Sequence, residues 1–567
     1  MTKSALSFTR SGDFVTGNST EIDMEKMRLK RFCSMIDCSR NAVLNIENLK
    51  KWIDVCAEMG YNSVMIYTED TYEIEGHPYF GYARGRYTKA ELKEIDAYAV
   101  ARGIEIIPFI QTLAHIEQIF RWADYKPMHD IDDILLCDCD GVYELIEDMF
   151  RTLAECFTTR TVNVGMDEAH NIGRGRYYDM HGDSVHRELL MRHLCRVAEI
   201  AKKYGFDICM WSDMYFNFAT GSTKYFKPNA EVDGRVSELI PENAELIYWD
   251  YYKRPQDDYT GMMRVHEKLK PGYWYAAGVW TWDGFATQNR YSIEALKNNL
   301  ESCRECGVEN VIVTCWGDGG GECSLYEALP ALFFAAEYVR GNGDMESIKA
   351  RFSERFGLSF DDFMLFDQVV REEKDVFYLS PSKYLLYNDP FIGLLDTTVP
   401  EGCREDYLEV ARLTEPLTKD ERWGYLFETN HKLALAVAAK CDIGIKIRAA
   451  YKSSDRDALR EYALELRRIR ELVYDFYLAF ERQWMKENKA YGFEVQDIRI
   501  GGIMTRLLHC ADRLDAYLRG EVGEIEELAA ELLDVHGTRD NPHGERRYLR
   551  YNKWPEIVTA GNLAISR

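Results

Sequence analysis

The sequence lacks any long apolar run. No stretch stays apolar for the roughly 18 residues that a transmembrane helix requires. The N-terminus, MTKSALSFTRSGDF, also lacks the apolar core of a secretory signal peptide. These two absences predict a protein without a membrane span that stays in the cytoplasm.

Basic residues are outnumbered by acidic ones. The chain carries 70 Lys and Arg residues against 94 Asp and Glu residues, which gives a formal net charge of -24. Because nucleic acids and anionic membranes are polyanions, such a surface excludes both as main partners. Aromatic residues, by contrast, are abundant, with 36 Tyr and 11 Trp. Sugars stack on such rings, although Trp also fills ordinary cores, so a neutral small molecule or oligosaccharide is the favoured ligand.

The sequence also lacks the residue spacings that are typical of the ligands of a metal site. Fifteen cysteines are scattered along the chain, and the two close pairs, Cys137 with Cys139 and Cys303 with Cys306, have no second pair at zinc-finger spacing. No HxH or HExxH pair occurs. We interpret the cysteines as reduced structural or surface thiols and predict neither a metal nor a cofactor.

The first 335 residues alternate candidate strands with amphipathic helices such as 46–60 and 89–103. A doubly wound sheet would show a glycine-rich phosphate loop after its first strand, and DCSRNAV is not one. Eight strand–helix units are the count of a (β/α)8 TIM barrel, which we predict over 1–335. The candidate strands are RFCSMID (31–37), NSVMIYT (62–68), IEIIPFI (104–110), TVNVG (161–165), DICMWS (207–212), ELIYWDY (245–251), WYAAGVWTW (274–282) and NVIVTCW (310–316).

From residue 336 onward the pattern changes to helices with few strand signals, and we predict an all-helical domain over 336–567. The helical stretches are 345–357, 431–452, 457–488 and 525–537. Residues 378–402, rich in Tyr, Pro and Gly, are expected to form an ordered loop. That loop could line the active site or an interface. A homodimer is possible.

Acids and indoles gather where the predicted strands end. In a (β/α)8 barrel these ends meet at one face and carry the catalytic groups. A ring of carboxylates, which accept hydrogen bonds from hydroxyls, and of indoles, which stack on sugars, predicts a pocket for a neutral polyhydroxy ligand. The strand-end residues are Asp37, Arg40, Glu69, Asp70, His115, Asp167, Glu168, Trp211, Asp213, Trp249, Asp250, Tyr252, Trp280, Trp282, Asp283, Trp316 and Asp318.

Within this ring, TVNVGMDEAH (161–170) places two acids side by side. Ordinary retaining glycosidases need two carboxyls about 5 to 5.5 Å apart that face the sugar from opposite sides. Neighbours on one strand end cannot easily straddle a sugar ring. They suit a substrate-assisted mechanism, in which the 2-acetamido oxygen of the substrate is the nucleophile. One acid then protonates the leaving oxygen, and the other orients the amide.

At these residues the sequence resembles glycoside hydrolase family 20, the β-N-acetylhexosaminidases. The family's Asp-x-x-Arg is similar to DCSR (37–40), its Thr-Asp-Asp to TED (68–70), its strand-3 pattern ending in His to PFIQTLAH (108–115), its Asp-Glu to residues 167–168 and its Trp-x-Glu to WGD (316–318). The resemblance covers the barrel only. Because the first strand begins near residue 31, we expect a divergent intracellular branch without the family's usual N-terminal α/β domain.

The resemblance implies a role for each matching residue. Glu168 would be the general acid/base, and Asp167 would orient the acetamido group and stabilise an oxazolinium-like intermediate. Arg40 and Asp318 would bind ring hydroxyls. The family's strand-7 Tyr falls on Thr281, and we expect Tyr252 to substitute for it. The remaining predicted substrate-binding residues are Asp70, His115, Trp211, Trp249, Trp282, Asp283 and Trp316.

Two alternatives stay open from the sequence. A two-carboxylate retaining β-glycosidase would use Glu168 as acid/base and Asp283 as nucleophile, but it leaves Asp167 without a role. A sugar-binding protein without catalysis would not need the intact Asp-Glu pair. The favoured interpretation of the sequence is therefore an exo-β-N-acetylhexosaminidase that acts on terminal β-linked GlcNAc or GalNAc.

Overall fold

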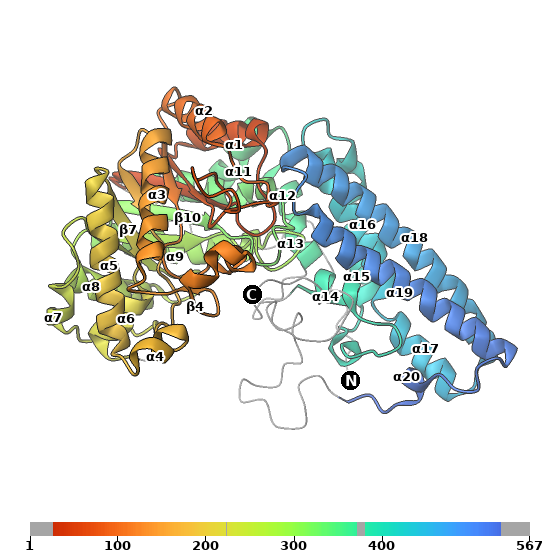
Figure 1. Ribbon diagram of the computed structural model, residues 1–567. Coiled ribbons are helices and arrows are strands. Elements are labelled where there is room, and N and C mark those ends of the chain that lie inside the picture. The colour runs from red at the N-terminus through yellow and green to blue at the C-terminus, as the bar shows by residue number, and fades with distance from the viewer. Residues whose placement is uncertain (1–25, 223, 371–379, 534–567) are drawn as a thin grey trace.

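A computed structural model describes residues 26–222, 224–370 and 380–533 (Figure 1). Its centre is a closed barrel of eight parallel strands in the order β1-β10-β9-β8-β7-β6-β3-β2. This confirms the predicted TIM barrel. The strands are β1 (Arg31–Asp37), β2 (Ser63–Tyr67), β3 (Glu105–Phe109), β6 (Thr161–Asn163), β7 (Asp207–Trp211), β8 (Ala244–Trp249), β9 (Trp274–Gly278) and β10 (Asn310–Cys315).

The strand register brings the carboxyl ends of neighbouring strands level. Asp37 pairs with Tyr67, and Phe109 pairs with both Tyr67 and Asn163. The segments that follow β1, β2, β3 and β6 therefore emerge on the same face of the barrel. A small hairpin, β4 (His129–Ile131) with β5 (Ile134–Leu135), lies in the segment after β3 and has no counterpart among the predicted strands.

Helices cover the outside of the barrel, and local sequence signals explain several of their ends. The Asn45 side chain caps the start of α1, and Gly60 ends that helix in the left-handed conformation. Thr88 and Glu91 form a capping box at the start of α2. The covering helices are α1 (Ile46–Met59), α2 (Lys89–Val100), α3 (Asp140–Cys156), α4 (Arg176–His181), α5 (His186–Lys203), α6 (Asp213–Thr220), α7 (Gly234–Ser237), α8 (Gln256–Leu269), α9 (Asn289–Cys306) and α10 (Leu329–Val339).

The predicted helical domain follows, and its long helices run side by side next to the barrel (Figure 1). Phe285 of the barrel packs edge-on against Phe476 and Phe480 of α18, so the two parts share apolar contacts. The helices are α11 (Met345–Phe356), α12 (Phe360–Phe363), α13 (Leu365–Val370), α14 (Pro381–Tyr387), α15 (Cys403–Thr414), α16 (Gly424–Lys440), α17 (Ile443–Lys452), α18 (Arg456–Glu487), α19 (Phe493–Arg519) and α20 (Glu526–Ala529).

The predicted segments and the observed helices do not coincide everywhere. The expected domain border at 335/336 lies within α10, which packs on α9, and the division of the chain there stays a prediction. The expected loop 378–402 contains α14 and the 3-10 turn Asp396–Thr398, while residues 378 and 379 lie outside the described part. Helix α19 was not predicted, since Gly501 and Gly502 interrupt its pattern. Within the described residues, no helix has the length and apolarity to cross a membrane.

Candidate active site

Aromatic side chains inside the barrel form the floor of the site. Trp211, at the end of β7, is almost fully buried and contacts Phe109 edge-on at 5.7 Å between ring centroids. Trp316, just after β10, lies 5.9 Å from Trp211 and 5.1 Å from Tyr67. These rings pack together inside the barrel, next to the carboxyl ends of its strands.

The turn after β6 holds Asp167 through a glycine. Gly165 adopts φ +71°, and a Cβ there would lie 1.9 Å from Gln111 Oε1. The absent side chain lets Gln111 reach the turn, where it donates to Asp167 Oδ1 at 3.0 Å and accepts from the Met166 amide at 3.3 Å. Met166 and Glu168 also have positive φ, 67° and 52°. Such backbone strain is common at functional sites.

His115 lies between three carboxylates. Its Nε2 is 3.3 Å from Asp167 Oδ2 and 3.7 Å from Glu168 Oε2, and its Nδ1 is 3.5 Å from Asp133 Oδ2. Burial alone would lower the pKa of His115, but the charge and hydrogen bond of Asp167 outweigh it and raise this pKa to about 10. The imidazole is therefore a cation at neutral pH.

The two neighbouring acids of the turn differ in environment. Burial opposes the ionisation of Asp167, yet His115 and the Gln111 amide hold its pKa below the usual range. The Glu168 side chain is 54% exposed against 16% for Asp167. Partial withdrawal from water, together with the charge of Asp167, raises the pKa of Glu168. The pair thus combines an ionised carboxylate with a neighbouring carboxyl group that holds its proton more readily, an arrangement for acid–base chemistry.

Asp213, which follows β7, contacts the turn that carries Asp167 and Glu168. Its Oδ2 accepts a hydrogen bond from the Glu168 amide at 3.0 Å. Burial, with the charge of Asp167, raises the pKa of Asp213 to about 8. A proton on this carboxyl group at neutral pH limits the negative charge gathered around Asp167 and Glu168.

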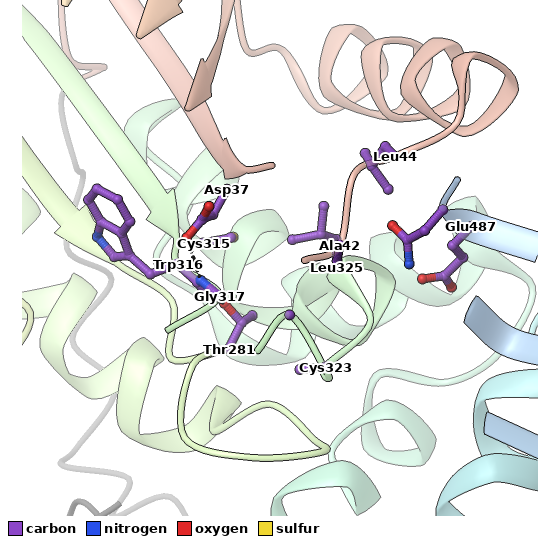
Figure 2. Close-up of a pocket in the computed structure, with 12 residues that line it drawn as sticks. Asp37, Ala42, Leu44, Thr281, Cys315, Trp316, Gly317, Cys323, Leu325 and Glu487 are labelled. Carbon is purple, nitrogen blue, oxygen red and sulfur yellow. Dashed lines mark hydrogen bonds between the residues drawn. The ribbon is translucent and has the colours of Figure 1, made fainter. Parts of the chain in front are cut away.

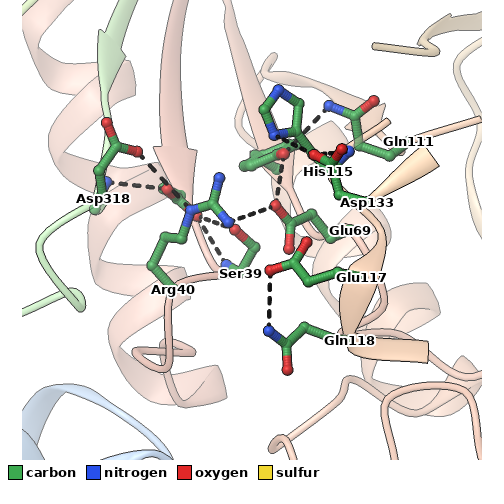
Figure 3. A network of polar contacts seen from close by, with 12 residues as sticks. Ser39, Arg40, Glu69, Gln111, His115, Glu117, Gln118, Asp133 and Asp318 are labelled. Carbon is green, nitrogen blue, oxygen red and sulfur yellow. Dashed lines mark hydrogen bonds and ion pairs between the residues drawn. The ribbon is translucent and has the colours of Figure 1, made fainter. Parts of the chain in front are cut away.

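A second polar group centres on Arg40 and is joined to Gln111 through the Tyr67 hydroxyl (Figure 3). Arg40 forms an ion pair with Glu69 at 2.9 Å and lies 3.8 Å from Asp318. Glu69 also accepts a hydrogen bond from the Tyr67 hydroxyl at 2.8 Å. Burial raises the pKa of Glu69 to about 7, against the opposing charge of Arg40. Asp318 is 43% exposed, so its carboxylate and the Arg40 guanidinium are available to ligand hydroxyls.

Aromatic rings from β8 and β9 form a third group. Trp249 stacks on Tyr251, with 5.3 Å between centroids and 25° between planes, and Tyr251 meets Trp282 at 5.7 Å. Withdrawal from water raises the pKa of Tyr251 well above its usual value, and the charge of Asp167 adds to this rise. The phenol of Tyr251 is therefore within electrostatic reach of the Asp-Glu turn.

Three of the predicted site residues make contacts with other side chains in the structure. Asp70 is buried and forms an ion pair with Arg84 at 2.8 Å, so its neighbour Glu69 takes the place beside Arg40. Asp283 is 1% exposed and accepts a hydrogen bond from the Gln288 side-chain amide. Tyr252 packs edge-on against Phe226 and Trp280. The other predicted residues lie at or just after the carboxyl ends of the barrel strands: Arg40, His115, Asp167, Glu168, Trp211, Trp249, Trp282, Trp316 and Asp318.

Sequence reasoning missed Gln111 and Tyr251 and did not select Glu69. Gln111 lies four residues before His115 in QTLAH, a stretch that contains no acid. At the end of β8, Tyr252 was selected in place of its neighbour Tyr251. Glu69 was noted at a strand end, but its match to the family motif was no better than that of Asp70. For metals, no group of three or more His, Cys, Asp or Glu in the described ranges is arranged to hold an ion.

Comparison with known families fits this geometry. The profile of the glycosyl hydrolase family 20 catalytic domain matches residues 33–258, and the profile of the glycoside hydrolase 20C C-terminal domain matches residues 359–547. The chain belongs to glycoside hydrolase family 20. It is thus a glycoside hydrolase of the β-hexosaminidase group, as the strand-end motifs predicted, and the helical part is a recognised companion of the barrel.

Individual relatives are distant. Hexosaminidase D of Bos taurus is 24% identical over 323 residues, which cover 53% of this chain and 90% of that protein. Hexosaminidase D of Homo sapiens is 22% identical, over 53% of this chain and 64% of that protein. A solved structure of a family 20 exo-β-N-acetylglucosaminidase from Vibrio harveyi overlaps 60% of this chain and 58% of its own, with 15% identity and a TM-score of 0.44.

Proposed function

We propose that this protein is an exo-β-N-acetylhexosaminidase that releases terminal β-linked GlcNAc or GalNAc by a retaining, substrate-assisted mechanism. The observation that carries the proposal is the contrast within one turn between Asp167, whose pKa is lowered, and Glu168, whose pKa is raised. A carboxyl group with a lowered pKa beside one with a raised pKa matches the division of labour that substrate assistance requires.

In this mechanism Glu168 protonates the leaving oxygen and later removes a proton from water. Its exposure at the pocket mouth suits contact with the glycosidic oxygen. Asp167 accepts the acetamido N–H and offsets the positive charge that develops as the acetamido oxygen attacks the anomeric carbon. His115 and Gln111 hold Asp167 in this orientation and keep it ionised.

The remaining proposed contacts come from other residues at the strand ends. We assign the donor to the acetamido oxygen to Tyr251. In support, its ring contacts those of Trp249 and Trp282, and the charge of Asp167 contributes to its raised pKa. Arg40 and Asp318 would bind ring hydroxyls. No geometry favours the two-carboxylate alternative, because Asp283 is buried against Gln288.

The stereochemical test is direct. Proton NMR of 4-nitrophenyl β-N-acetylglucosaminide hydrolysis should show the β-anomer as the first product. First formation of the α-anomer would mean inversion and would refute the mechanism.

The second test uses a thiazoline mimic of the cyclised intermediate. Wild type should bind it tightly, because Asp167 contacts the ring nitrogen. Asp167→Asn keeps the size and removes the charge, so inhibition should weaken and kcat should fall by about 10²-fold or more. Equal inhibition of both proteins, or none of wild type, would return Asp167 to a structural role and favour a two-carboxylate enzyme.

We also propose that the enzyme works in a reducing compartment such as the cytosol. In support, the CxxC pair Cys303 and Cys306 forms no disulfide, and neither does the pair Cys137 and Cys139. Cell fractionation with an antibody against the chain would test this location.

A further inference from the structure

The segment that carries Asp318 is rich in glycine, so its own sequence does not define its backbone conformation. It reads WGDGGGECS, residues 316–324, and contains four glycines. Gly320 and Gly321 have φ of +112° and +65°. Glycine loses more conformational freedom on folding than any other residue, so a defined position for this loop must be imposed by its neighbours.

Two buried cationic side chains of the helical domain form hydrogen bonds and ion pairs with this loop. Lys383 of α14 donates to the Gly319 carbonyl at 2.8 Å and forms an ion pair with Glu322 at 2.6 Å. Arg499 of α19 makes the same two contacts, at 3.1 Å to the Gly319 carbonyl and 2.6 Å to Glu322. The side chains of Lys383, Arg499 and Glu322 are at most 3% exposed.

The glycines let these cations approach the backbone. A Cβ at Gly319 would lie 3.1 Å from Lys383 Nζ, and a Cβ at Gly320 would lie 2.9 Å from an Arg499 nitrogen. Glu322 remains ionised despite burial, because the two cations hold its pKa below the usual range. Charge-assisted hydrogen bonds thus fix the loop just after Asp318. Just before Asp318, the Gly317 amide donates to Asp37 Oδ2 at 3.0 Å.

Packing beside the same loop is incomplete. A pocket there is lined by Gly317, Gly321 and Cys323 of the loop and by Glu487 of the helical domain, among others (Figure 2). The Gly319 backbone makes its contacts with Lys383 and Arg499 at its carbonyl and, at its amide, with the Trp282 carbonyl at 3.1 Å.

Asp318 directly precedes Gly319, whose carbonyl accepts these hydrogen bonds, and it faces Arg40. We propose that Lys383 and Arg499 are positioning residues for substrate binding, through which the helical domain sets Asp318 in place for a sugar hydroxyl. This inference rests on the proposed function for its substrate. Neither cation touches the sugar; both act through the loop.

The experiment measures Arg499→Gln in wild-type and Asp318→Ala backgrounds. In the wild-type background KM for 4-nitrophenyl β-N-acetylglucosaminide should rise about tenfold or more, the worth of a hydrogen bond to a charged group, with a smaller change in kcat. In the Asp318→Ala background the same substitution should cause no further loss. The matched control is Arg506→Gln, on the same helix and paired with Asp389 at 2.7 Å, which should leave KM unchanged.

Losses that multiply in the two backgrounds, or an unchanged KM in Arg499→Gln, would overturn the inference. If Arg499→Gln does not fold, Arg499→Lys, which keeps a cation, takes its place in the double-mutant cycle with Asp318→Ala. Hydrogen exchange gives a readout that needs no turnover: amides of 316–324 should exchange faster in Arg499→Lys but not in Arg506→Lys. A wild type without turnover would refute the proposed function, whereas unchanged exchange in Arg499→Lys would refute the clamp.

Discussion

At the scale of single residues, the central feature of the site is the positive charge of His115. The imidazole is held as a cation by Asp167, with Asp133 at its other nitrogen and Glu168 nearby. Its charge lowers the pKa of both members of the Asp-Glu pair, although burial still leaves that of Glu168 raised. The charge of His115 thus shifts the pKa values of both carboxyl groups, Asp167 and Glu168.

We predict that His115→Gln shifts the whole pH profile of kcat/KM to higher pH. Loss of the cation raises the pKa of Asp167, so the acidic limb, where Asp167 must ionise, moves up. It also raises the pKa of Glu168, so the alkaline limb, where Glu168 must keep its proton, moves up too. Initial rates across the pH range, in buffers of constant ionic strength, would measure both limbs.

The matched control for this profile is His431→Gln in α16, whose ring bonds the Ala411 carbonyl in the helical domain. It should leave both limbs in place. A His115→Gln profile that keeps its limbs while losing height would mean that His115 orients the pair without tuning it.

At the scale of elements, the strand ends were the part of the site that the sequence could predict. Parallel strands in a barrel place the residues after them on one face, so the position of Arg40, Asp167 or Trp316 needs only the strand pattern. Which of two neighbours points inward depends on the turn after each strand. Asp70 was predicted to bind the substrate, and in the structure it is buried and forms an ion pair with Arg84, from the loop before α2.

The contacts of Lys383 and Arg499 could not be predicted in the same way. They join the loop after β10 to residues 64 and 180 positions away along the chain. Charged residues on helices usually face solvent, and their sequence surroundings give no sign of a glycine-rich loop packed on them.

The end of β8 offers a test of this neighbour problem. We predict that Tyr251→Phe lowers kcat for the N-acetyl substrate by about tenfold or more, because a donor to the acetamido oxygen is lost. Tyr252→Phe is the matched control and should change kcat little, since its ring packs on Phe226 and Trp280. Steady-state kinetics of both variants decide the assignment, and the reverse order of effects would restore Tyr252.

At the scale of the whole molecule, the barrel and the helical domain are joined by both apolar and polar contacts. Trp423 packs on Tyr326 at 5.5 Å between centroids, beside the contacts of Phe285 with α18. The buried carboxyl of Glu487 accepts hydrogen bonds from Ser324 and from Tyr425, both at 2.7 Å. Separation of the two parts would expose aromatic surface and leave buried polar groups without partners, both of which cost free energy.

We therefore predict that the chain unfolds in one cooperative transition, although chains with two domains often show two. Differential scanning calorimetry should give a single endotherm whose calorimetric and van't Hoff enthalpies agree. The thiazoline mimic binds only the barrel, yet it should raise the midpoint of the entire transition, because ligand binding stabilises every part that unfolds together. Glu487→Gln should lower the single midpoint without splitting it. Two endotherms, with only one moved by the ligand, would show that the helical domain folds independently and would contradict the coupling described here.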